Sequence, residues 1–305
     1  MTLPTSRAPS APTPGEAIRL SVVMPVLNEE RTLRLALNRL VHTDLPCPLE
    51  VIVVDDGSTD GTWDLLTAFR CAHGEVVLCR HERNRGKGAA VLTGLDVATG
   101  THALVFDADL EYDPEDIRRM LQPVIEGRAA TVYGTRLFGR DTVYQSFWFA
   151  LGNRATTLAA NVLYDAAISD LHTCLKLLPL PLLRSLDLDE QGFGLDTQIT
   201  ARMLMSGVRP YEVPISYNSR TREEGKKIGW KHGVESIAIL RRERAAARRR
   251  PTWMQVSRDV ARFQRGQAVE RLIAMEEARI AARLVARLAG ADPRVDVVAR
   301  AEAGA

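Results

Sequence analysis

Short apolar segments alternate along the first hundred residues with segments whose apolar positions recur every three or four residues. The apolar segments are Leu20–Leu27, Val51–Val54, Val76–Leu78 and Ala103–Phe106, and the segments with helical spacing are Glu29–Val41, Thr62–Ala72 and Ala89–Ala98. Strands that are apolar on both faces and alternate with helices of this length are typical of a parallel sheet covered on both sides. The pattern therefore predicts an α/β fold in which helices flank a mostly parallel sheet.

The rest of the chain is less regular. Helices are expected from Pro114–Glu115 onward and over Asn153–Tyr164 and Phe193–Ser206, with strands at Thr131–Gly134 and Tyr211–Tyr217. Residues 1–17 are rich in Pro, Ser and Thr and predict a disordered leader. We expect one α/β domain over residues 18–235, followed by an arginine-rich helical C-terminal extension over residues 236–305.

Three polar clusters close or directly follow predicted strands, at Pro25–Glu30, Asp55–Asp60 and Asp107–Glu111. In parallel sheets, ligands bind beyond the carboxyl ends of the strands, so we expect the clusters to converge on one crevice. Asp107, Asp109 and Glu111 share one face of an extended segment. Crowded carboxylates are costly unless a cation neutralises them, and their oxygens suit Mg²⁺ or Mn²⁺. The alternative is an acidic loop that caps the next helix through Asp113.

The cluster Asp55–Asp60 is suited to a nucleotide. A carboxylate there can accept hydrogen bonds from a nucleobase or a ribose, although a tight turn with a helix cap explains the same residues. The segment Asn84–Gly88 resembles a phosphate cradle but lacks the GxxxxGK[ST] spacing, which argues against a P-loop nucleoside triphosphatase. Basic residues recur later in the chain, at Arg136, Arg154, Arg220, Arg222, Lys226 and Lys227. They could clamp a diphosphate or an anionic acceptor, or they could be solvated surface charges.

Composition narrows the class of protein. Of the 305 residues, 46% are hydrophobic and 26% are charged, which excludes disordered, collagen-like and membrane-spanning classes. The net charge of +2 conceals a basic segment, residues 241–290, with 13 arginines against 5 acidic residues. This segment predicts contact with an anionic membrane surface or another macromolecule. Four cysteines without zinc spacing and no long apolar stretch predict a cytoplasmic protein, with any membrane contact peripheral on the inner face of the cell membrane.

Eight motifs occur in order: MPVLNEE (24–30), VVDDGSTDGT (53–62), NRGKGAA (84–90), DADLEYDP (107–114), YGTR (133–136), DLHTCLK (170–176), GFGLDTQITA (192–201), and EVPISY with EGKKIGWKHG (212–233). Together they resemble glycosyltransferase family 2, and within it the polyprenyl- or dolichyl-phosphate sugar synthases, over about residues 19–235. The resemblance implies a GT-A fold. It also implies an inverting, metal-dependent transfer of a hexose from a nucleotide-diphosphate sugar, of the GDP-mannose or UDP-glucose type, to a polyprenyl phosphate.

The resemblance further implies roles for residues at matching positions. The nucleobase and ribose would contact Pro25, Leu27, Glu29, Val54 and Asp56. Asp107 and Asp109 would bind Mg²⁺ or Mn²⁺, with Glu111 completing the coordination. Arg136 and Arg154 would lie near the donor diphosphate or the acceptor phosphate, and Lys87 and Ala108 would also belong to the cofactor-binding residues. Arg220, Lys226 and Lys227 would come from a flexible loop that closes over the phosphates.

The identity of the acceptor depends on fewer residues. The predicted catalytic residues are Asp109, Arg136, Asp170 and Asp196. A lipid phosphate is already ionised at pH 7, whereas a hydroxyl acceptor needs a general base, for which Asp170 and Asp196 are the candidates unless each is structural. Three positions depart from the family pattern: His172 replaces an acidic residue, Leu175 an aromatic one and Gln198 a glutamate. These departures leave the choice between a lipid and a soluble acceptor open.

An aromatic group, Phe147, Trp148 and Phe149, stands just ahead of Arg154. These aromatic residues suit a membrane interface, where a prenyl chain could lie while its phosphate contacts Arg154. Packing in the core explains the same residues equally well. One competing interpretation is a family 2 enzyme with a soluble hydroxyl acceptor, such as a secondary metabolite or saccharide. Another is a non-catalytic protein that binds a nucleotide sugar or a nucleic acid through its arginine-rich tail, although no recognised nucleic-acid motif is present. The apolar stripe Ile273–Leu288 suits packing against the domain or against a second subunit, so the sequence does not decide whether the protein is an oligomer.

Overall fold

The computed structural model describes residues 18–246, apart from 74–75, 138–141, 145 and 221–229. These residues all belong to one compact unit. The predicted leader, most of the predicted C-terminal extension and the stripe Ile273–Leu288 lie outside the described residues.

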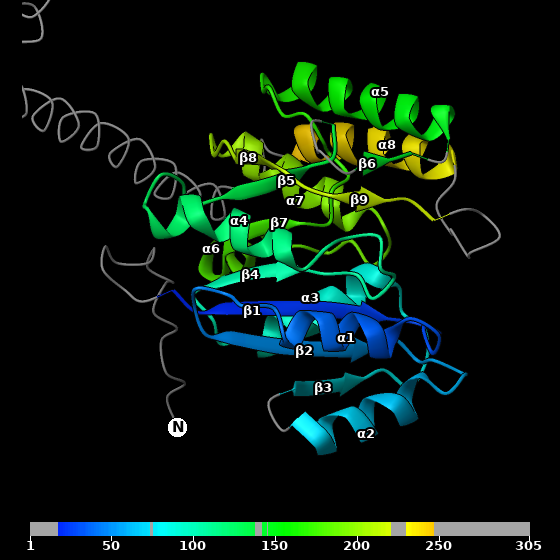
Figure 1. The fold of residues 1–305 in the computed structure, drawn as a ribbon. Helices are drawn as coiled ribbons and strands as arrows, with labels where there is room; N and C mark the ends of the chain where they lie inside the picture. The colour runs from blue at the N-terminus through cyan, green and yellow to red at the C-terminus, as the bar shows by residue number, and fades with distance from the viewer. Residues whose placement is uncertain (1–17, 74–75, 138–141, 145, 221–229, 247–305) are drawn as a thin grey trace, which may run out of the picture. The chain divides into compact units, whose positions relative to one another are not determined.

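A mixed sheet in the order β3-β2-β1-β4-β7-β5-β8 forms the centre of this unit, and β6 pairs with β9 beside it (Figure 1). The strands are β1 (Leu20–Val26), β2 (Leu49–Asp55), β3 (Val76–Arg80), β4 (His102–Val105), β5 (Val132–Thr135), β6 (Thr142–Val143), β7 (Lys176–Pro179), β8 (Tyr211–Pro214) and β9 (Tyr217–Asn218). All pairs in the main sheet are parallel except those of β7 with β4 and β5. The predicted mostly parallel sheet is therefore confirmed.

Helices cover the sheet on both faces, with α1 and α4 in front of it and α3 behind it in Figure 1. The helices are α1 (Leu33–Val41), α2 (Thr62–His73), α3 (Lys87–Val97), α4 (Glu115–Ile125), α5 (Phe147–Tyr164), α6 (Leu180–Ser185), α7 (Leu195–Met205) and α8 (Trp230–Ala246). The core between the layers is built from the apolar strands and from one side of each helix, such as Leu33, Leu37 and Leu40 of α1. This burial follows from the apolar spacing along the chain.

Two predicted elements begin or end elsewhere for reasons of polar bonding. Helix α1 starts at Leu33 and not at Glu29; residues 30–32 form a turn, in which the carbonyl of Glu29 accepts the N–H groups of both Thr32 and Leu33. The predicted strand Tyr211–Tyr217 divides into β8 and β9. The N–H of Ser216, at the division, donates to the Asp116 carboxylate at 2.7 Å, and so leaves the strand ladder.

Strand β7 was not expected from the pattern, and α5 begins six residues earlier than predicted. Helix α8 crosses residue 235, the predicted end of the α/β domain, and packs against α5 and α7. In Figure 1, α5 lies at the end of the structure away from β3, with α8 beside it. Residues up to 246 are therefore packed on the α/β unit.

Candidate active site

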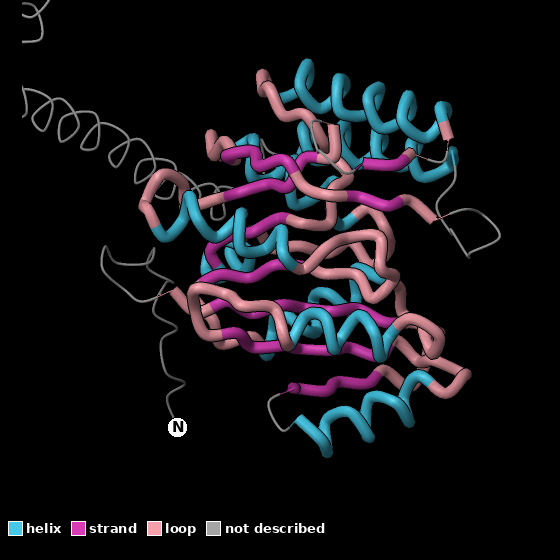
Figure 2. Tube along the Cα trace, viewed as in Figure 1, coloured by secondary structure: helices cyan, strands magenta, loops and turns pink. Residues whose placement is uncertain are grey.

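A cavity of about 760 Å³ lies beyond the carboxyl ends of β1, β2 and β4, where the loops that follow these strands gather on one side of the sheet (Figure 2). Residues of all three polar clusters line it, so the prediction that they converge on one crevice is confirmed. The predicted site residues in its lining are Pro25, Leu27, Glu29, Asp56, Lys87, Asp107, Ala108, Asp109, Glu111, Arg136, Asp196 and Arg220. Val54, Arg154 and Asp170 do not line it, and Lys226 and Lys227 lie outside the described residues.

Asp56 shapes one wall of the cavity through the turn that precedes α3. Its Oδ1 accepts the Nδ1–H of His81 at 2.6 Å and the backbone N–H of Arg85 at 2.9 Å, and its Oδ2 accepts the N–H of Gly86 at 2.8 Å. The carboxylate thus holds the glycine-rich turn in place, and Lys87 follows directly at the start of α3. Val54 is buried within β2.

Asp107 is held by two donors at the end of β4. Lys87 Nζ donates to its Oδ2 at 2.8 Å, and the thiol of Cys174 donates to the same oxygen at 2.9 Å. Burial opposes ionisation of this carboxyl, but the positive charge of Lys87 outweighs it and lowers the pKa of Asp107. Burial and the neighbouring Asp107 raise the pKa of the Cys174 thiol well above its ordinary value. Cys174 therefore acts as a protonated donor that orients Asp107.

Asp109 and Glu111 bind the guanidinium of Arg220. Arg220 Nη2 lies 2.8 Å from Asp109 Oδ2, and the Arg220 backbone N–H donates to Glu111 Oε1 at 2.9 Å. Burial and the charges of Asp107 and Glu111 raise the pKa of Asp109 to about 7. Crowded carboxylates of this kind fit a hard divalent cation. As they stand, however, no three His, Cys, Asp or Glu side chains in the described part of the chain are arranged to hold a metal ion.

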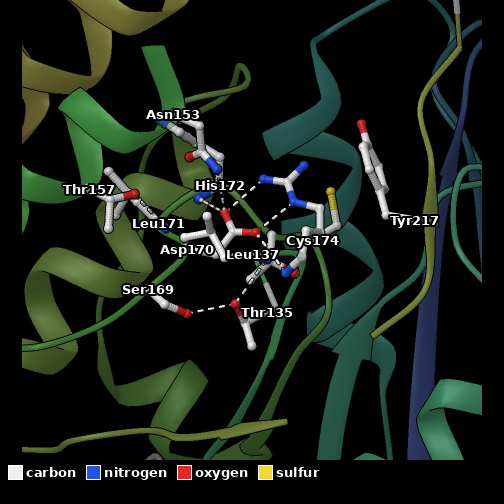
Figure 3. Close-up of polar contacts among 12 residues, drawn as sticks. Thr135, Leu137, Asn153, Thr157, Ser169, Asp170, Leu171, His172, Cys174 and Tyr217 are labelled. Carbon is white, nitrogen blue, oxygen red and sulfur yellow. Dashed lines mark hydrogen bonds and ion pairs between the residues drawn. The ribbon is translucent and has the colours of Figure 1, made fainter. Parts of the chain in front are cut away.

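Arg136 crosses to the opposite wall and forms a buried two-pronged ion pair with Asp170. Its Nε and Nη2 lie 2.6 and 2.7 Å from the two oxygens of Asp170, and Asn153 Nδ2 donates to the same carboxylate at 3.0 Å. Figure 3 shows Asp170 beside Asn153, with Tyr217 farther across the site. The guanidinium also lies 4.8 Å from the centre of the Tyr217 ring. Burial would raise the pKa of Asp170, but Arg136 and Asn153 lower it to about 2.

Asp196 and His172 complete the lining on this side. Asp196 Oδ1 lies 3.2 Å from the buried Lys176 Nζ. The Thr156 hydroxyl lies 2.9 Å from Nε2 of His172, within hydrogen-bond distance, and also contacts backbone carbonyls of its own helix turn. Burial, and then the charge of Lys176, lower the pKa of His172 to about 4, so the imidazole is neutral at pH 7.

Sequence comparison places the chain in a family. The model of glycosyl transferase family 2 matches residues 21–179, which is about half of the chain. A polyprenol monophosphomannose synthase of Mycolicibacterium smegmatis is 32% identical over 221 residues, covering 69% of this chain and 82% of the relative. The chain belongs to glycosyl transferase family 2. An undecaprenyl-phosphate 4-deoxy-4-formamido-L-arabinose transferase of Serratia proteamaculans is 37% identical over 134 residues, covering 43% of this family 2 chain and 39% of the relative.

The fold of this family 2 transferase matches that of solved structures. Glucosyl-3-phosphoglycerate synthase of Mycobacterium tuberculosis, crystallised with Mn²⁺, UDP and glucosyl-3-phosphoglycerate, aligns with a TM-score of 0.54 at 20% identity. The alignment covers 75% of this chain and 80% of that chain. At this identity the likeness shows the fold alone, and the predicted GT-A fold is confirmed.

Two residues of the cavity lining, Cys174 and Tyr217, were given no role from the sequence, and His172 was noted only as a departure from the family pattern. Cys174 and His172 lie within the DLHTCLK motif, and Tyr217 ends the EVPISY motif, so their positions in the motifs were the available signal. What their side chains contact depends on residues far away in the chain. Tyr217, for example, donates to Glu111 Oε2 at 2.7 Å across 106 positions.

The aromatic group at the start of α5 is partly exposed. Phe147 and Trp148 are 71% and 75% exposed, which excludes the interpretation that they are core residues. Trp148 and Phe149 line the family 2 transferase cavity. Arg154 is exposed farther along the same helix. An apolar surface is therefore continuous with the cavity.

Proposed function

We propose that the protein transfers a hexose from a nucleotide-diphosphate sugar to a polyprenyl phosphate, with inversion at the anomeric carbon. The observation that carries this proposal is the composition of one cavity. It joins a carboxylate cluster at the end of β4 to the Arg136 guanidinium and to the aromatic start of α5. The carboxylate cluster suits a cation with a diphosphate, the guanidinium suits an acceptor phosphate, and the aromatic residues suit an apolar chain.

The donor lies, in this proposal, against the ends of β1, β2 and β4. Pro25, Leu27, Glu29 and the wall shaped by Asp56 hold the base and ribose. Asp107 and Asp109 hold Mg²⁺ or Mn²⁺, which when bound neutralises the charge that develops on the leaving diphosphate. Lys87 and Cys174 keep Asp107 ionised and oriented for that task.

The charge partners of the two candidate bases favour an acceptor that is already ionised. Asp170 is fully buried and bonded to Arg136 and Asn153, so its pKa of about 2 leaves it too weakly basic to remove a hydroxyl proton. Asp196 is paired with Lys176. A lipid phosphate needs no proton removed, and Arg136, held in place by Asp170, is the cation that would bind it.

The exposed side of α5 supports a lipid acceptor. Phe147, Leu151, Leu158 and Val162 are all exposed and recur at intervals of four, seven and four residues, so they project from one side of the helix. An apolar stripe that starts next to the cavity-lining Trp148 suits a prenyl chain or the surface of the bilayer that contains it. No helix within the described residues is long and apolar enough to cross a membrane.

The proposal is tested by incubating the protein with UDP-glucose or GDP-mannose, Mg²⁺ or Mn²⁺, and polyprenyl phosphate, and then looking for a lipid-linked sugar. We expect product in one of the donor arms and none with Asp109→Ala or in excess EDTA. Asp64→Ala, which removes an exposed carboxylate on α2, is the matched control and should retain activity. Full activity of Asp109→Ala would remove the metal role, and donor hydrolysis without lipid product would refute the lipid acceptor.

A second candidate function keeps the donor and replaces the lipid with a soluble hydroxyl acceptor. The observation in its favour is His172, which lines the cavity and is neutral at pH 7; when its Nε2–H donates to Thr156, its Nδ1 is a hydrogen-bond acceptor. A hydroxyl can donate to this nitrogen, whereas an ionised phosphate oxygen cannot. If this candidate is correct, adding saccharide acceptors to the same incubation yields a glycosylated saccharide, and His172→Phe reduces that product and not donor hydrolysis.

A further inference from the structure

Arg220 lies where a cation would bind between two carboxylates of the site. It follows β9, and its guanidinium is mostly buried, 2.8 Å from Asp109 Oδ2 and 3.6 Å from Glu111 Oε1. Glu29, on the opposite wall, is 3.8 Å away. The carboxylates thus surround a side chain of the protein itself.

Nearly every oxygen of the cluster is already in use. Asp109 Oδ1 accepts the N–H of Glu111 at 3.1 Å, and its Oδ2 binds Arg220. Glu111 Oε2 accepts the Tyr217 hydroxyl, and its Oε1 accepts the N–H of Arg220. Asp107 Oδ2 is bonded to Lys87 and Cys174. Among the described residues, Asp107 Oδ1 is therefore the one oxygen of these three carboxylates that has no partner.

We propose that Arg220 is a positioning residue that occupies the place of the divalent cation until a nucleotide diphosphate arrives. A lone pair of Asp109 Oδ2 can accept an N–H of Arg220 or coordinate a metal ion, and a guanidinium and a divalent cation this close repel each other. The cation therefore binds at Asp109 only when Arg220 moves away. The diphosphate provides the anion to which the guanidinium moves.

This arrangement couples the two ligands. A nucleotide that binds Arg220 vacates Asp109 and so tightens cation binding, and the cation tightens nucleotide binding by the same factor. The inference rests on the proposed metal-dependent function and adds the order of events: the free protein binds the cation weakly, and the nucleotide-bound protein binds it tightly.

The test measures Mn²⁺ binding to the full chain from the electron paramagnetic resonance signal of free Mn²⁺, alone and with UDP or GDP. We expect Arg220→Gln to bind Mn²⁺ alone at least tenfold more tightly than the unchanged protein does. The tightening by nucleotide should be at least threefold smaller in the variant. Arg118→Gln is the matched control, because it removes an exposed arginine that pairs with Asp44, and should leave Mn²⁺ binding unchanged.

Salt distinguishes direct occupation from a long-range charge effect. In 0.5 M KCl the Debye length is below about 10 Å, so long-range charge effects are screened, whereas direct contacts are not. The gain in Mn²⁺ affinity of Arg220→Gln should therefore persist in 0.5 M KCl. Unchanged Mn²⁺ binding in Arg220→Gln, or a gain that disappears in salt, would overturn the inference and leave the proposed function intact. Absence of Mn²⁺ binding in every protein, with and without nucleotide, would overturn both. If Arg220→Gln does not fold, Arg220→Lys keeps the positive charge but loses the guanidinium that contacts both Asp109 and Glu111. This variant should still bind Mn²⁺ about threefold more tightly than the unchanged protein, and no change would overturn the inference.

Discussion

The prediction with the largest structural effect concerns Glu243, on helix α8. Its carboxylate is buried and accepts Arg202 Nε at 2.7 Å, Arg202 Nη2 at 3.1 Å and Gln198 Nε2 at 2.9 Å. Arg202 is buried as well and also contacts Asp189 at 3.0 Å. Glu243→Ala would therefore leave a buried guanidinium with one carboxylate in place of two.

The size of the loss in unfolding free energy depends on the partners that Arg202 keeps. Breaking a buried ion pair by removing one partner costs about 3 to 5 kcal/mol. Because Arg202 keeps Asp189 and the carbonyl of Leu186, we expect the lower end, about 3 kcal/mol. In a domain of this size, that loss lowers the melting temperature by about 6 to 12 °C.

The assay is urea unfolding of the full chain, followed by circular dichroism at pH 7. Arg241→Ala, an exposed change on the same helix, is the control and should alter the free energy of unfolding by less than about 0.5 kcal/mol. Gln198→Glu should also destabilise the protein, because it places a third carboxylate beside Glu243 and Asp189. Adding Glu243→Gln to it should recover part of the loss.

Two results would refute this reasoning. If Glu243→Ala unfolds at the same urea concentration as the unchanged protein, α8 does not stabilise the domain through Arg202. If the double change Gln198→Glu with Glu243→Gln is as unstable as the sum of the single changes, the two side chains are not coupled.

Three further predictions concern pH, a turn and the surface of α5. Burial lowers the pKa of His102 to about 4, so this side chain binds fewer protons in the folded state than in the unfolded state below pH 6.5. As the pH falls from 7 to 5, His102 should therefore contribute about 2 kcal/mol to the loss of unfolding free energy, in addition to the similar contribution of His172, and the loss should be smaller by about that amount in His102→Asn. Gly57→Ala should destabilise the protein by at least about 1 kcal/mol in thermal unfolding, because φ is +76° and a Cβ would lie 2.6 Å from the Arg83 carbonyl carbon. Val162→Asp should leave the free energy of unfolding unchanged within about 0.5 kcal/mol, since the side chain is exposed, but weaken sedimentation with liposomes; equal sedimentation would contradict the proposed role of this face.

The strands and the position of the site could be predicted because both depend on local pattern. Apolar runs identify β1, β2 and β4, and in a parallel sheet the polar residues after each strand must meet at one edge. Strand β7 could not be predicted, because Lys176–Pro179 is short and became a strand through pairing with β4 and β5. The position of β7 between β4 and β5 is therefore known only from the tertiary structure.

The aromatic group of α5 shows a second limit. A run of apolar residues has the same pattern whether a helix faces the core or the surface, and here Phe147 and Trp148 are exposed. Gln198 shows the converse, since its departure from the family pattern has a physical explanation only when Glu243 is placed beside it.

The amino-acid sequence by itself determined the α/β class, the family and the set of residues at the strand ends, because these follow from periodicity and from motifs that are contiguous in the chain. The tertiary structure decided which charges neutralise one another. Arg136 and Asp170 are 34 positions apart, and Arg220 and Asp109 are 111 apart. Pairing over such separations depends on the packing of the sheet and its loops, and burial then makes each pairing strong enough to set the protonation and availability of the site carboxylates.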